Sequence, residues 1–293
     1  MRYKVFDVFA RAPLEGNPTG IVYYEGPEDT SLMQRLATEF PVPDTLFFTR
    51  KANAASLFAC RTFSPYEELA ICAQGLIGAM YALMEDGQVG PGHYVVETAL
   101  GFTGLLLEHC ETTSIFCSLG RPTLSEPHED ERVYLARLGL TNGIESPPMA
   151  YVALGRKRLV IEVPVAALGQ AIVEPAVTLD VCRALGLTGI VVFARDPNSP
   201  VLIRSRHFTT SLNGCEDAVT GGAAGAILAF CQQSQPKVNE LQVYQGGFAT
   251  RGGWIRTRTG SPDGEIWIGG TAVKMLEGKI HSFSANRGME PMR

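Results

Sequence analysis

Alternation of hydrophobic and polar positions runs along the chain and predicts strands in both of its halves. Two windows, residues 32–40 and 178–185, have the pattern of helices instead. Thr178 is a candidate cap for the second helix, and Gly186 follows its last turn, where glycine commonly ends a helix. These elements predict a chain of the α/β (α+β) class. The predicted strands span residues 5–10, 20–24, 45–49, 151–154, 159–163 and 189–194.

One segment of the first half recurs in the second half. Arg-Thr-Phe-Ser at residues 61–64 is followed by a polar loop and by an apolar helix entered at residues 72–80. Arg-His-Phe-Thr at residues 206–209 is followed in the same way by a helix entered at residues 219–227. From the arginine to the Gly-Ala step is seventeen residues in the first copy and nineteen in the second. The repeat implies two similar halves.

Small residues form the first turns of both predicted helices. The free N–H groups and the positive dipole end of such a terminus suit a carboxylate or phosphate, and missing side chains let a ligand approach closely. The alternative is that Gly78, Gly222 and Gly225 only permit close packing of helix against sheet. Two copies in pseudo-symmetric positions favour ligand binding.

Two aspartates are candidates for proton transfer at these helix starts. Asp217 immediately precedes the second apolar helix, where it can either cap the helix or move protons. Asp44 lies in Pro-Val-Pro-Asp-Thr at the entry to a predicted strand, where an aspartate of a surface turn is the commoner explanation. The residues alone leave both alternatives open.

Other polar side chains near the helix starts have equally open roles. Gln74 can donate its amide to a ligand or cap the first helix. Cys72 and Cys215 each stand beside one helix start, where a lowered pKa would make a thiol a nucleophile or proton carrier, although free cysteines more often fill a core. His207 lies in the predicted strand of the second copy, and we expect a paired structural imidazole, with no histidine at either helix start.

Composition and charge narrow the class of function. The chain has 293 residues, of which 45% are hydrophobic and 19% charged, as in ordinary globular proteins. Its 25 basic and 30 acidic residues give a net charge of −5, so neither nucleic acid nor anionic lipid is an expected partner. No apolar window reaches the ~20 residues of a membrane span and no signal peptide is visible, which predicts a cytoplasmic protein. The polar stretch 123–132 is a candidate linker or a solvated loop.

Motif content excludes several enzyme classes. The seven cysteines form no CxxC pair, which indicates neither a disulfide framework nor a zinc site, and we expect most of them to be reduced and buried. The sequence contains no Gly-x-Ser-x-Gly, no phosphate-binding P-loop, no His-Glu-x-x-His and no Gly-x-Gly-x-x-Gly. Serine-hydrolase, nucleotide-binding and zinc-protease classes therefore have no support.

The segments around these residues resemble the PhzF-like (phenazine biosynthesis-like) isomerase family, whose members are relatives of diaminopimelate epimerase. The resemblance covers nearly the whole chain and rests on the order and spacing of several short motifs. These motifs lie at residues 5–9, 13–18, 33–39, 61–78, 216–221, 245–252 and 269–273.

The resemblance implies a diaminopimelate epimerase-like fold of two pseudo-symmetric halves, each a curved sheet or open barrel around a central helix. We expect these halves at residues 1–118 and 119–280, with the tail 281–293 a candidate addition to the first half, and an active site in the cleft between them. The resemblance also suggests a homodimer formed through the outer sheet faces.

Members of this family shift a proton or double bond in a small carboxylic acid without cofactor or metal. Their acid/base glutamate aligns with Asp44, and Asp217 is retained as a second carboxylate. The resemblance therefore implies Asp44 and Asp217 as catalytic residues. The substrate-binding residues expected from it are Asn17, Cys72, Gln74, Gly75, Thr220, Gly221 and Gly222.

Three positions depart from the pattern of the family. Asp44 is one methylene shorter than the glutamate, so the proton that it serves must lie differently. Gln74 replaces a histidine by an amide that cannot exchange a proton near neutral pH. Gly222 stands where the family has a serine. Because Asp44 and Asp217 remain, we expect a changed substrate rather than a dead enzyme.

A dihydropyrrole carboxylate of an alkylproline antibiotic pathway is a candidate substrate. Two alternatives stay open beside this isomerase. The first is a catalytically inactive protein of the same fold that binds a small carboxylate. The second is a thiol-based epimerase, which is less favoured because Thr220 stands where its second cysteine would be.

Overall fold

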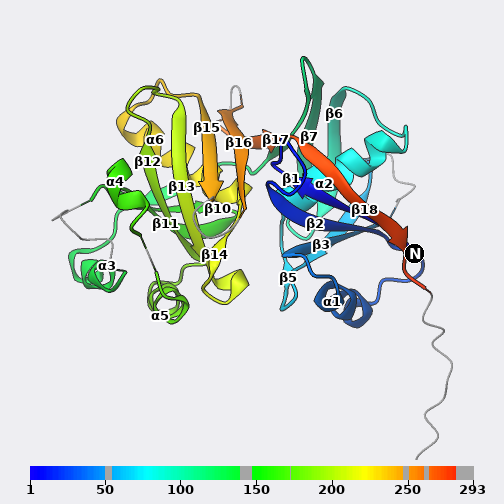
Figure 1. Ribbon diagram of the computed structural model, residues 1–293, viewed down its shortest axis with the longest axis horizontal. Helices are drawn as coiled ribbons and strands as arrows, with labels where there is room; N and C mark the ends of the chain where they lie inside the picture. Colours follow the sequence, from blue (N-terminus) through cyan, green and yellow to red (C-terminus); the bar gives the residue numbers. More distant parts are fainter. Residues whose placement is uncertain (50–54, 139–146, 172, 247–250, 261–263, 282–293) are drawn as a thin grey trace, which may run out of the picture.

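The computed structural model describes residues 1–293 apart from 50–54, 139–146, 172, 247–250, 261–263 and 282–293. In this part of the chain eighteen strands pair into one curved sheet, which runs through two lobes that lie side by side (Figure 1). None of the helices described is long and apolar enough to span a membrane.

The elements follow one another in two similar series. The first series is β1 (Arg2–Val8), β2 (Asn17–Tyr23), α1 (Thr30–Glu39), β3 (Asp44–Thr49), β4 (Ala59–Phe63), β5 (Glu68–Leu69), α2 (Ala73–Glu85), β6 (Gly92–Thr98), β7 (Gly101–His109) and β8 (Thr113–Ser118). After β9 (Thr123–Ser125), η1 (Glu129–Arg132) and α3 (Val133–Arg137), the second series is β10 (Met149–Leu154), β11 (Arg156–Glu162), α4 (Val165–Leu168), α5 (Pro175–Leu185), β12 (Gly189–Arg195), β13 (Leu202–Thr209), η2 (Thr210–Leu212), β14 (Glu216–Asp217), α6 (Gly221–Ser234), β15 (Glu240–Gly246), β16 (Gly252–Thr259) and β17 (Ile266–Gly270). The last strand is β18 (Ala272–Lys279).

Strand pairing has the same order in the two halves. In the first half β2 is parallel to β3, β3 is antiparallel to β4, and β4 is parallel to β6. In the second half β11 is parallel to β12, β12 is antiparallel to β13, and β13 is parallel to β15. The apolar helix follows the short strand β5 or β14 in each. The predicted α/β fold of two pseudo-symmetric halves is confirmed.

The two apolar helices form the centre of each half. α2 is buried from Ala73 to Leu83, and α6 is buried along most of its length. A helix that is apolar on all sides needs contacts all round, and both helices pack with the inner faces of the strands in one hydrophobic cluster. A Cβ atom at Gly78 would lie 2.8 Å from Thr19, and one at Gly225 would lie 2.9 Å from Leu154. These two glycines therefore serve the packing of helix against sheet.

The halves exchange strands at their junction. β8 is antiparallel to β17, with Ser118 opposite Trp267 and Ile115 opposite Gly270. β18 then returns to the first half and pairs with β1 along its whole length. The boundary at residues 118 and 119 stays a prediction, but strand pairing places β18, which we expected in the second half, beside the first. Residues 282–293 of the predicted tail lie outside the described residues.

Two local predictions need correction. α5 begins at Pro175 after the N-cap residue Glu174, because the fixed φ of proline suits a first turn. Thr178 is therefore not a cap, and it lies buried within the helix. Gly186 ends the helix in the left-handed conformation, as predicted. The candidate linker 123–132 contains β9 and η1 and is not a bare linker.

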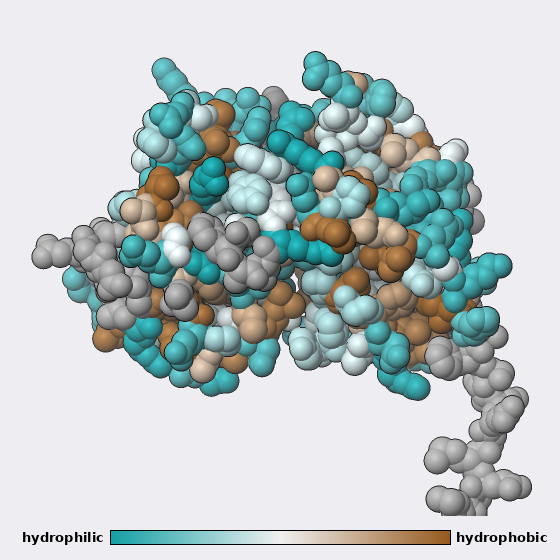
Figure 2. All heavy atoms as spheres, in the orientation of Figure 1, coloured by the Kyte–Doolittle hydropathy of each residue, from teal (hydrophilic) through white to brown (hydrophobic). Residues whose placement is uncertain are grey.

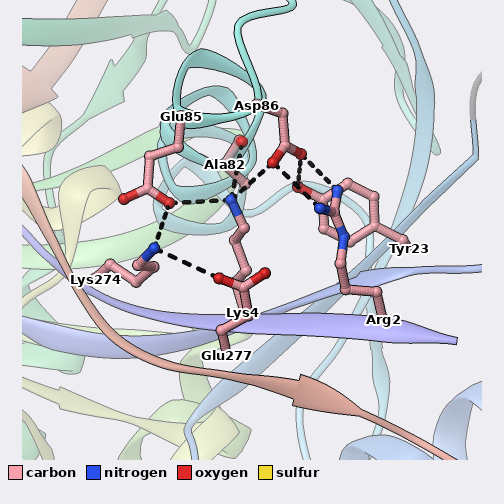
Figure 3. Close-up of polar contacts among 8 residues, drawn as sticks. All are labelled: Arg2, Lys4, Tyr23, Ala82, Glu85, Asp86, Lys274 and Glu277. Atoms are coloured by element: carbon pink, nitrogen blue, oxygen red, sulfur yellow. Dashed lines mark hydrogen bonds and ion pairs between the residues drawn. The ribbon is translucent and has the colours of Figure 1, made fainter.

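A network of charged side chains attaches the C-terminal end of α2 to β1 and β18 (Figure 3). The ammonium of Lys4 lies 3.0 Å from Glu85 and 3.1 Å from Asp86, and it donates to the carbonyl of Ala82 at 3.3 Å. A cation beside the last carbonyls of a helix also complements the helix dipole. Lys274 binds Glu85 from β18 at 3.2 Å. The other members drawn are Arg2, Tyr23 and Glu277.

Lys4→Met should lower the free energy of unfolding by about 2 kcal/mol, because two partly exposed carboxylates lose a buried partner. Lys274→Met is the matched control. The side chain of Lys274 is 38% exposed, and we expect a loss below about 1 kcal/mol. Urea unfolding at neutral pH measures both, and equal losses would contradict the account.

Candidate active site

A cavity of about 80 Å³ lies between the N-terminal ends of α2 and α6 and is lined from both halves. Among the residues predicted for the site, those that line it are Asp44, Cys72, Gln74, Asp217, Thr220, Gly221 and Gly222. Gly75 and Asn17 are not among its lining residues, although both contact residues that are. The fold thus brings most of the predicted residues together at one place.

Asp44 is the first residue of β3 and faces the cavity from the first half. The thiol of Cys72 donates to its Oδ2 atom at 3.6 Å. Burial and, next, the negative charge of Asp217 raise the pKa of Asp44 to about 7, while the Cys72 hydrogen bond and Arg156 act in the opposite direction. A carboxyl group with this pKa can both accept and return a proton near neutral pH.

Asp217 ends β14 and faces the same cavity from the second half. Its Oδ1 atom accepts a hydrogen bond from Asn17 Nδ2 at 2.8 Å, and its Oδ2 atom accepts one from the Thr220 hydroxyl. Burial raises the pKa of Asp217 to about 6, although these two hydrogen bonds lower it. The N-cap residue of α6 is Thr220. The capping role considered for Asp217 is therefore wrong.

The hydrogen bonds continue from Asp217 through Thr220 to His207. Because the Thr220 hydroxyl donates to Asp217, it accepts the hydrogen bond from His207 Nδ1 at 2.8 Å. Burial and then the charges of Arg158 and Arg156 hold the pKa of His207 well below its ordinary range, so the imidazole is neutral. Its Nε2 atom is buried without a hydrogen-bond partner among the described residues.

His207 lines the cavity, so the expectation that no histidine lies at either helix start is wrong. The residue lies opposite Asp217 in the pairing of β13 with β14. The pairing of β13 with β14 places the imidazole at the start of α6. This register is not visible in the sequence of either strand alone.

Several polar groups at the N-terminal end of α2 form hydrogen bonds with other groups of the protein. Cys72 is its N-cap residue, and the Cys72 sulfur accepts a hydrogen bond from the N–H of Gly75 at 3.3 Å. Burial, followed by the charge of Asp44, raises the pKa of this thiol well above its ordinary value, which argues against a thiolate nucleophile. Gln74 donates its amide to the carbonyl of Pro18 at 3.0 Å. All seven cysteines are free and four are buried.

Two arginines that our sequence analysis missed face the cavity from β11. Side chains alternate along a strand, so Arg156, Arg158 and Val160 share a face, and Val160 packs in the cluster that contains α6. Burial and the charge of Arg156 lower the pKa of Arg158 to about 9, at which it is still a cation at neutral pH. The sequence shows only that Arg158 alternates in phase with Val160 along one strand; that this face of β11 packs toward α6 is a long-range property of the fold.

The sequence matches the family model described as "Phenazine biosynthesis-like protein" over residues 6–278. The chain belongs to this phenazine biosynthesis-like family. A trans-2,3-dihydro-3-hydroxyanthranilate isomerase of Pseudomonas aeruginosa is 26% identical over 286 residues, which cover 96% of this chain and 99% of the relative. An uncharacterised isomerase of Mesorhizobium japonicum is 27% identical over 297 residues, which cover 95% and 98%.

The same family also supplies a structural relative. The crystal structure of a PhzF-family phenazine biosynthesis protein from Bacillus anthracis superposes with a TM-score of 0.83 at 23% identity, over 96% of this chain and 99% of that one. The predicted phenazine biosynthesis-like family and the prediction of an enzyme of the isomerase type are confirmed.

Titration of single carboxyl groups tests the environment of Asp44. Carbon-13 NMR of labelled aspartate should show Asp44 titrating near pH 7, and Asp217→Asn should lower this pKa, because the variant removes a negative charge. The folded-state pKa lies above that of an unfolded aspartate. Ionisation of Asp44 therefore reduces stability as the pH rises from about 4 to about 7. An Asp44 resonance that titrates below pH 5 would contradict the account.

Proposed function

We propose that this protein is a cofactor-independent isomerase that moves a proton, and with it a double bond, within a small unsaturated (amino) carboxylic acid. The observation that carries the proposal is the pair Asp44 and Asp217, one from each half, in a single cavity with pKa values of about 7 and 6. Carboxyl groups poised near neutral pH suit proton transfer to and from carbon.

In the proposed reaction the ionised carboxylate of Asp44 accepts a proton from one carbon of the substrate. The electron pair of that C–H bond forms a new double bond, and the old double bond shifts its electrons to its far carbon. That carbon takes a proton from the protonated Asp44, so atoms and charge balance. Asp217, held by Asn17 and Thr220, is the second acid/base group of the cavity.

The finer proposal is that the substrate is a dihydropyrrole carboxylate of an alkylproline antibiotic pathway. A cavity of about 80 Å³ suits a compact acid. Asp44, Gln74 and Gly222 also differ from the residues that the family pattern has, as expected for a changed substrate. A cytoplasmic location and the absence of nucleic-acid binding stay predictions from the sequence.

A carboxylate-binding protein without catalysis is the second candidate. It is favoured by Gln74, whose amide is bound to Pro18 and cannot exchange protons near neutral pH. A thiol-based epimerase has less support, because the pKa of the Cys72 thiol is raised and Thr220 stands in the place of a second cysteine. Exchange of substrate hydrogen with solvent separates the isomerase from the binding protein.

In deuterated water the isomerase should introduce deuterium at one carbon of the product, which mass spectrometry and NMR detect. Asp44→Asn and Asp217→Asn should each lower turnover by about 100-fold or more, the usual scale for acid/base groups, with nearly unchanged melting temperatures. Asp180→Asn, on the exposed face of α5, is the control and should retain full turnover. Tight binding without exchange at any carbon, across a panel of cyclic unsaturated amino acids, would favour the binding protein.

We also propose that two copies associate through the outer sheet face of the first half. Hydrophobic residues gather on the lobe that carries β18 (Figure 2). A largely apolar cavity of about 650 Å³, lined among others by Leu14, Phe40 and Leu276, opens on this face. Leu14 is 64% exposed and Leu276 is 59% exposed, as suits a surface that a partner covers.

Light scattering should therefore give a mass of about twice 31.7 kDa. Leu276→Glu should shift the mass toward that of the monomer, because a charge would lie in the apolar interface. Leu100→Glu, an equally exposed leucine in the turn between β6 and β7, is the control and should leave the mass unchanged. A monomeric wild-type protein would contradict this association.

A further inference from the structure

We propose that Arg158, whose guanidinium lies in the space that Gly222 leaves open, binds the carboxylate of the substrate at the N-terminal end of α6. This assignment deepens the proposed function and rests on it. It makes Arg158 the residue that selects a carboxylate, and it gives the orientation of the acid within the cavity.

Arg158 carries a buried positive charge with unused hydrogen-bond donors. Its side chain is 5% exposed. Nη1 donates to the carbonyl of Arg156 at 3.1 Å, whereas Nε is buried without a partner among the described residues. Asp217 attracts the guanidinium through space, but the Asp217 oxygens already accept hydrogen bonds from Asn17 and Thr220. A buried cation of this kind calls for an anionic ligand.

The guanidinium of Arg158 occupies the volume that a side chain at position 222 would fill. A Cβ atom on Gly222 would lie 2.9 Å from Nη2 and 3.3 Å from both Cζ and Nη1 of Arg158. A serine here, as in the family pattern that the sequence resembles, would therefore push the guanidinium away from the helix. In this chain the guanidinium of Arg158 lies where the side chain of such a serine would begin.

The first turn of α6 adds backbone donors at the same point. Its N-cap residue Thr220 makes no capping hydrogen bond, because the hydroxyl is committed to Asp217. The N–H groups of Ala223 and Ala224 both bond to the carbonyl of Thr220. The N–H groups of Gly221 and Gly222, the first two residues of α6, have no partner within the helix. Those N–H groups, the dipole of α6 and the guanidinium together suit a carboxylate.

The start of α2 has the free N–H groups of its own first turn, but in the described part of the chain no guanidinium lies against its glycine as Arg158 lies against Gly222. The N–H of Gly75 donates to the Cys72 sulfur, and the amide of Gln74 donates to Pro18. The carboxylate of the substrate therefore faces α6 and the second half. Its reacting carbons then face Asp44 on the side of the first half.

Calorimetric binding of two unreactive probes, pyrrole-2-carboxylate and pyrrole-2-carboxamide, tests this assignment in the full-length protein. The wild type should bind the carboxylate at least about tenfold more tightly than the carboxamide, the scale of a hydrogen bond to a charged group. Arg158→Met should weaken the carboxylate at least about tenfold and leave the carboxamide nearly unchanged. Gly222→Ser should have the same effect through a different residue, and Arg158→Lys should restore part of the affinity.

Arg204→Met, an exposed arginine on β13, is the matched control and should bind both probes like the wild type. Asp44→Asn should abolish isotope exchange but keep the preference for the carboxylate. The wild type could show a carboxylate preference that depends on Arg158 but no isotope exchange. That result would contradict the proposed isomerase activity and support the role of Arg158 in carboxylate binding. Equal affinity for the two probes, no measurable binding of the carboxylate, or unchanged binding in a folded Arg158→Met protein would overturn the proposal.

Discussion

The hydrogen bond from Asn17 to Asp217 joins the two halves of the molecule at the place where we propose the chemistry. Asn17 begins β2 in the first half and Asp217 ends β14 in the second, and both side chains are buried. The same amide nitrogen donates to the carbonyl of Val219, just before α6 begins, at 2.9 Å. Movement of one half against the other would leave Oδ1 of the buried Asp217 carboxylate without its Asn17 donor, which is costly. The arrangement of the cavity therefore depends on this contact.

Much of the fold could be predicted, because its signals are local. The segments that follow Arg61 and Arg206 each show a strand, a loop and an apolar helix, and their repetition predicts two halves without knowledge of strand pairing. Arg158 and His207 escaped prediction for the opposite reason. Their place in the site depends on the register of β13 with β14 and on which face of β11 meets α6, and both are long-range properties of the sheet.

The polar groups of the cavity divide into proton carriers and anion binders. Asp44 and Asp217 have raised pKa values mainly because the site is buried, and this same burial keeps His207 neutral. Arg158 stays charged and lies on the sheet rather than on a helix. The guanidinium of Arg158 fills the space that a side chain at Gly222 would need, so the positive charge at the start of α6 comes from the strand β11.

The most direct test of this account is a crystal structure with pyrrole-2-carboxylate bound. We expect the carboxylate within hydrogen-bond distance of the Arg158 guanidinium and of the first N–H groups of α6, and a ring carbon within about 3.5 Å of an Asp44 oxygen, as proton transfer requires. A carboxylate bound at the start of α2, or a ring out of reach of Asp44, would contradict it.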